Sequence, residues 1–184
     1  MDPIAKEALP HLRYEFQMLL ATARLLQTRG LPSDHAYALL ESWVLHVRNL
    51  IDFFYTPKKM DDVVMVEFSS GWKGIREFPK ITTELARARD RANKEMAHLT
   101  YSRIGKSDAD RQWAVGPITS QLIERMKAFA DLVADDETST EVRKLLPKDR
   151  KARFVVAAVA NTSGFSGEAT VSGPFAKRDP GKDQ

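Results

Sequence analysis

The stretch LPSDHAYALLESWVLHVRNLIDFFYTP, residues 31–57, constrains the fold more than any other part of the chain. Its apolar residues recur every three or four positions, which is the period of an amphipathic α-helix. Ser33 or Asp34 is suited to cap the start of this helix, and Pro57 ends the pattern. Because a long helix must bury its apolar face against other elements, we predict a helical bundle.

Apolar spacing and punctuation by Pro and Gly predict the remaining helices. They are residues 3–29, broken or bent at Pro10 and stopped at Gly30, residues 79–103, residues 116–134, and a short helix with a Ser/Thr-x-x-Glu start at Thr138. The segment DVVMVEF reads as a loop with packed apolar side chains. The expected fold is all-α, an antiparallel bundle of about four long helices plus a short fifth helix over residues 1–147.

The composition changes after Pro147. The last 25 residues hold four of the nine glycines and show no helical periodicity. Chains of this composition do not bury enough apolar surface to offset the entropy of ordering. We therefore expect residues 148–184 to be a largely flexible C-terminal extension.

Charge and composition exclude several classes of function. The chain has no cysteine, which removes disulfides, thiolate metal sites and a cysteine nucleophile. Its formal net charge of +3 permits contact with nucleic acid without demanding it. It has no apolar run of 18 residues and no basic-then-apolar leader, so we expect a cytoplasmic protein that does not enter a membrane.

We expect neither a metal nor a cofactor. His35 and His46 share a helix face but lie about 16 Å apart along its axis, too far to share an ion. The glycine-containing segment SSGWKG is too short for a phosphate-binding loop and lacks its Lys-Ser/Thr ending.

The helix predicted from residue 33 carries a polar strip of Glu41, Arg48 and Asp52, with Leu45 among them. Arg48 and Asp52 are four residues apart and can pair on the helix surface, which is worth about 0.2–0.5 kcal/mol if exposed. Two interpretations stay open. The strip is a solvated run of salt bridges, or it faces a groove shared with the helix predicted over residues 79–103.

That later helix contains the segment DRANKEMAHLTYSR, in which Arg91 and His98 are seven residues apart. In an α-helix this spacing puts both near one face, about 10.5 Å apart along the axis. Arg87 and Lys94 lie around them, and Asn93 flanks the apolar stripe. The helix therefore presents a basic ridge with a histidine at its end.

A bundle of about four helices with Arg91, six intervening residues and His98 resembles the HEPN superfamily, whose motif is Arg-x(4–6)-His. The resemblance covers about residues 35–135 and rests on two fixed residues. It implies a metal-independent ribonuclease that acts as a homodimer with its motif helices facing each other. His98 would serve as acid or base at the ribose 2′-hydroxyl, and Arg91 would hold the scissile phosphate.

The residues beside this motif and on the facing polar strip are further candidates for binding RNA or a nucleotide phosphate: Arg87, Lys94, Asn93, Arg48, Glu41 and Asp52. One departure concerns catalysis, because Ala92 follows Arg91 where catalytic members often carry a polar residue. Other members of the superfamily are non-catalytic nucleotide-binding or interaction modules.

The alternative function is a non-catalytic helical interaction or scaffold protein with a protein partner, such as an antitoxin. Arg91 would then pair with Glu95 or with the Glu41 and Asp52 strip, and His98 would bond to a carboxylate or carbonyl of a neighbouring helix. The two functions predict different surroundings. An RNA site puts Arg91 and His98 at an accessible groove or a dimer axis, whereas a scaffold satisfies both within one subunit.

Overall fold

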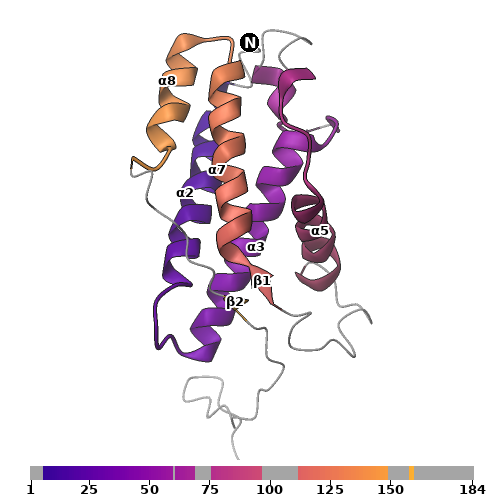
Figure 1. The fold of residues 1–184 in the computed structure, drawn as a ribbon. Helices are drawn as coiled ribbons and strands as arrows, with labels where there is room; N and C mark the ends of the chain where they lie inside the picture. The colour runs from indigo at the N-terminus through magenta and orange to yellow at the C-terminus, as the bar shows by residue number, and fades with distance from the viewer. Residues whose placement is uncertain (1–5, 60, 69–75, 97–111, 149–157, 160–184) are drawn as a thin grey trace, which may run out of the picture.

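The computed structural model describes residues 6–59, 61–68, 76–96, 112–148 and 158–159. Its main helices lie side by side as an antiparallel bundle (Figure 1). They are α2 (Leu9–Leu25), α3 (Ser33–Tyr55), α5 (Thr83–Arg91), α7 (Val115–Leu132) and α8 (Asp136–Leu145). The all-α bundle predicted from the sequence is confirmed. Most of the predicted C-terminal extension lies outside the described residues.

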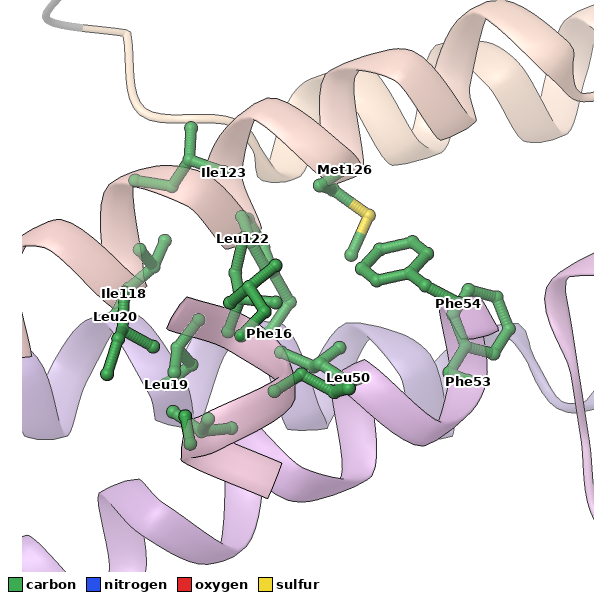
Figure 2. Close-up of a cluster of buried hydrophobic side chains, with 14 of the residues drawn as sticks. Phe16, Leu19, Leu20, Leu50, Phe53, Phe54, Ile118, Leu122, Ile123 and Met126 are labelled. Atoms are coloured by element: carbon green, nitrogen blue, oxygen red, sulfur yellow. The ribbon is translucent and has the colours of Figure 1, made fainter. Parts of the chain in front are cut away.

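Helix α3 is the centre of the bundle. It packs against α2, α5 and α7, while α8 covers α7 and α2 (Figure 1). Apolar side chains from α2, α3 and α7 meet between the helices, among them Phe16, Leu50 and Leu122 (Figure 2). Each such side chain contributes about 1.5–3 kcal/mol when fully buried, so the periodic stripe on α3 is what organises the fold.

The predicted bounds of α3 agree with the structure, but its predicted cap is wrong. The helix begins at Ser33 itself, so Pro32 occupies the cap position, and no side chain caps the helix. Asp34 lies in the first turn, where its negative charge interacts favourably with the helix dipole. The amide N–H groups in the first turn of α3 therefore receive no hydrogen bond from a capping side chain.

The start of α8 also differs from the prediction. The helix begins at Asp136, and Asp135 caps it by accepting bonds from the Thr138 amide at 2.8 Å and hydroxyl at 2.6 Å. A carboxylate is a strong N-cap acceptor, so it takes the role that the sequence interpretation gave to Thr138. Glu141 pairs instead with Lys144 at 2.5 Å.

The helix predicted over residues 79–103 is not a uniform α-helix. It begins at Thr83, where the Thr82 hydroxyl accepts a bond from the Leu85 amide at 3.2 Å. After Arg91 it continues as a π-helix, η2 (Ala92–Met96). A π-turn holds one more residue than an α-turn and often marks a functional site. Residues 97–103, the expected end of this helix, lie outside the described residues.

Three shorter elements flank the main helices. The loop predicted for DVVMVEF includes a 3₁₀ turn, η1 (Met65–Phe68), and the predicted packing of its apolar side chains is confirmed, since Met65 and Phe68 are buried. β1 (Trp113–Ala114) pairs antiparallel with β2 (Ala158–Val159) at the start of α7. None of the helices that the structure describes is both long and apolar enough to cross a membrane.

Candidate functional site

Arg91 ends α5, and Glu95 lies just beyond it in η2. The Arg91 Nε donates to Glu95 Oε1 at 3.0 Å, and Nη2 donates to Oε2 at 3.1 Å. This is a two-point pairing of a guanidinium with a carboxylate, the strongest common geometry for such a pair. The side chains are 24% and 10% exposed, so solvent screens the pair less than it would on an open surface.

The same guanidinium also contacts the segment before α7. Nη1 donates to the backbone carbonyl of Gln112 at 2.8 Å, and the guanidinium carbon lies 4.2 Å from the ring centroid of Trp113. Trp113 is 1% exposed and packs edge-to-face against Trp43 of α3, with 6.0 Å between the ring centroids. Arg91 therefore joins α5 to β1 and, through Trp113, to the core.

All three guanidinium nitrogens of Arg91 thus donate to acceptors in the same chain. Of the ordinary partners that the sequence left open for this residue, Glu95 is the one observed. Arg91 keeps two further N–H groups, because a guanidinium has five. They are what remains for any outside ligand.

His98 lies outside the described residues, so the proximity of Arg91 and His98 stays a prediction. The axial separation and shared face were derived for a regular α-helix. Since Ala92–Met96 form a π-helix, the side chains of these five residues are rotated from the α-helical positions used for that expectation.

The predicted polar strip on α3 faces α5 and η2. Glu41, Arg48 and Leu45 line a small pocket of 210 Å³ together with Ala92 and Met96 of η2. This is the groove-facing arrangement, one of the two interpretations that the sequence left open. Arg87 on α5 and Lys94 on η2, by contrast, are exposed and do not line this pocket.

Asp52 connects the strip to α5. Its Oδ1 accepts bonds from Arg89 Nε at 2.5 Å and from the Thr56 hydroxyl at 3.0 Å, and its Oδ2 lies 3.8 Å from Arg48 Nε. Arg89 Nη2 also donates to the Thr56 hydroxyl at 3.2 Å. One carboxylate therefore serves two guanidinium groups that come from two different helices.

Arg89 was missed by the sequence interpretation, which included its neighbours. Arg89 and Asn93 are four residues apart, the spacing that places side chains on one side of a helix. That spacing, together with Asp52 in the α3 strip, was the signal in the sequence that could have identified Arg89 as a site residue. The structure puts Arg89, Asn93, Arg48 and Asp52 in the lining of one pocket.

A second missed contact joins α2 to α3. His46 is buried, and its Nδ1 lies 2.7 Å from Glu15 Oε2, which also accepts a bond from Asn49 Nδ2 at 3.2 Å. The ring of Tyr14 packs edge-to-face on His46. From the sequence, His46 was considered only as a metal ligand. Among the described residues no group of three or more His, Asp or Glu side chains is arranged to hold a metal ion.

Comparison of the chain with protein-family models, with curated proteins and with solved structures finds no match.

Proposed function

We propose that this chain is a helical module that acts by binding a ligand or a partner and does not itself cleave RNA. The observation that carries this proposal is the two-point pairing of Arg91 with Glu95, reinforced by the Gln112 carbonyl and the Trp113 ring. This is the surrounding that the scaffold alternative predicts for Arg91.

The physical argument concerns the charge of Arg91. A catalytic arginine stabilises a phosphorane-like transition state because its positive charge and its donors are aimed at the developing anion. Here the Glu95 carboxylate already neutralises that charge in a sheltered position. Drawing the guanidinium onto a phosphate would break its two bonds to Glu95, and a hydrogen bond to a charged group is worth about 1.5–3 kcal/mol. Arg91 is thus better suited to holding the structure than to holding a substrate.

The experiment incubates purified chain with mixed single-stranded RNA in the presence of a chelator. Wild type, Arg91→Ala, His98→Ala and the control Arg24→Ala, an exposed site on α2, are compared. We expect no cleavage above the buffer blank for any of them, together with a lower unfolding midpoint for Arg91→Ala than for Arg24→Ala. Cleavage by wild type and Arg24→Ala that both other substitutions abolish would overturn the proposal.

A second candidate function is direct contact with RNA or a nucleotide phosphate, with metal-independent cleavage by Arg91 and His98. It is favoured by the π-turn that directly follows Arg91, because such turns concentrate at functional sites. The exposed cations Arg87 and Lys94 lie on the same segment. In this candidate the chain acts as a homodimer, so loss of cleavage on dilution, parallel to dissociation measured by sedimentation, would distinguish it from the first.

A further inference from the structure

The pocket between α3 and α5 contains more positive charge than the partly exposed Asp52 carboxylate can neutralise. Arg48 and Arg89 both approach Asp52, at 3.8 Å and 2.5 Å. At the rim, the exposed side chains Lys59 and Asp62 carry opposite charges and offset each other. The surplus therefore comes from the two guanidinium groups that share one carboxylate.

The shape of the pocket suits a small ligand. Its volume is 490 Å³, within the range of about 300–1,000 Å³ typical of small-molecule sites. Phe53 and Val64, which are buried, provide apolar lining, and Asn49, Asn93 and Thr56 provide polar groups. Most of the remaining lining is polar or charged, which suits a charged ligand better than an apolar one.

One donor in this pocket is unsatisfied. Arg48 Nε is buried, and among the described residues it has no hydrogen-bond partner. The 3.8 Å separation from Asp52 Oδ2 is an ion pair but too long for a hydrogen bond. A buried donor without an acceptor costs about 1–3 kcal/mol, and an anionic oxygen would recover that free energy once the guanidinium turns to present Nε to the pocket.

We propose that this pocket binds a small molecule that carries an oxyanion, either a phosphate or a carboxylate group. Arg48 and Arg89 are the residues that contact the oxygens of this group. The planar forks of two arginines from separate helices match the oxygens of such a group. The inference rests on the proposed function only in that the chain acts by binding. The site residues differ from Arg91 and His98, so the two proposals fail independently.

The test is calorimetric titration and thermal unfolding of the full chain with inorganic phosphate and, separately, with succinate, against chloride at the same ionic strength. Comparison of the two arms identifies the oxyanion. We expect saturable binding of at least one of them and a raised unfolding midpoint. Neither ion differing from chloride would overturn the proposal.

Variants locate the binding. Arg48→Gln and Arg89→Gln should each weaken binding about tenfold, since a hydrogen bond to a charged group is worth that much. Arg87→Gln, on the same helix but outside the pocket, should leave binding unchanged. Equal affinity of all three variants would place the ion elsewhere and refute the site.

Asp52→Asn should change the affinity for the oxyanion in the opposite direction to the two arginine variants. An increase in affinity cannot be explained by misfolding of the variant. The substitution removes the carboxylate that competes for both arginines while keeping the size of the side chain. We expect tighter oxyanion binding in this variant, even where its stability without ligand falls. Weaker binding by a folded Asp52→Asn, as judged by circular dichroism, would contradict the proposed roles of Arg48 and Arg89.

Discussion

The guanidinium of Arg91 lies 4.2 Å from the ring centroid of Trp113, a residue 22 positions further along the chain that is 1% exposed. The contact couples the end of α5 to the start of α7. It also explains why an arginine in the middle of a charged segment is only 24% exposed. A cation over the face of an indole, bonded to a carboxylate as well, contributes to stability through both contacts.

Replacement of Arg91 tests this structural role. Arg91→Ala removes the bonds to Glu95 and Gln112 and the contact with Trp113, and we expect the free energy of unfolding to fall by about 1–3 kcal/mol. Chemical denaturation with urea measures the change. Arg91→Lys should recover only part of the loss, because an ammonium does not form the two-point pairing.

The matched control is Arg87→Ala, an exposed arginine one turn earlier on α5. Surface substitutions of this kind change stability by about 0.5 kcal/mol or less. A loss at position 87 as large as that at position 91 would mean that α5 is sensitive to any lost cation, and the role given to the Arg91 contacts would be wrong.

The buried bond between the Trp43 indole and the Thr119 hydroxyl, 3.1 Å long, gives a second prediction. Thr119→Val keeps the shape of the side chain and leaves the indole N–H without its acceptor inside the core. We expect a loss of about 1–3 kcal/mol of unfolding free energy. Thr140→Val on the exposed face of α8 is the control and should be near neutral; equal effects of the two would contradict the importance of the bond.

A third prediction concerns acid pH. The hydroxyl and the amide of Thr138 both donate to Asp135 and lower the pKa of its carboxyl below the usual value of 3.8. Because the folded-state pKa is the lower one, the stabilisation is fully present above the unfolded-state value and is lost as the pH falls through the lowered value. Thermal unfolding should therefore show a contribution from Asp135 at neutral pH that fades below about pH 5.

The comparison for this prediction is between Asp135→Asn and Asp136→Asn. The second site is exposed and lies in the first turn of α8 without capping it. Asp135→Asn should flatten the acid side of the curve of unfolding midpoint against pH more than Asp136→Asn does. Parallel curves for both variants and wild type would show that the cap carries no pH-dependent stability.

The sequence predicted the parts of the fold that depend on local chemistry. The helix over Ser33–Tyr55 has the bounds expected from its apolar period and its flanking prolines. The start of α8 was misplaced, because several residues of DDETST can act as caps and only the folded geometry selects Asp135. The π-turn after Arg91 was also missed, because α-helical periodicity gives no sign of one inserted residue.

In the candidate site, too, contacts between sequence neighbours were predicted, whereas contacts between helices were not. Glu95 was among the expected partners of Arg91, because four-residue spacing makes neighbours on a helix. Trp113 and Gln112 were not expected, since their approach depends on how α5 and α7 pack. Similarly, Asp52 was identified as a strip residue, but its bond to Arg89 of another helix required the three-dimensional fold.

The central claim is that Arg91 is committed to Glu95 within its own chain, and a double-mutant cycle measures this most directly. The free energies of unfolding of wild type, Arg91→Ala, Glu95→Ala and the double variant yield the coupling between the two residues. We predict a coupling of about 1 kcal/mol or more in favour of the pair. A coupling of zero would show that Arg91 is available for another role and would contradict the account.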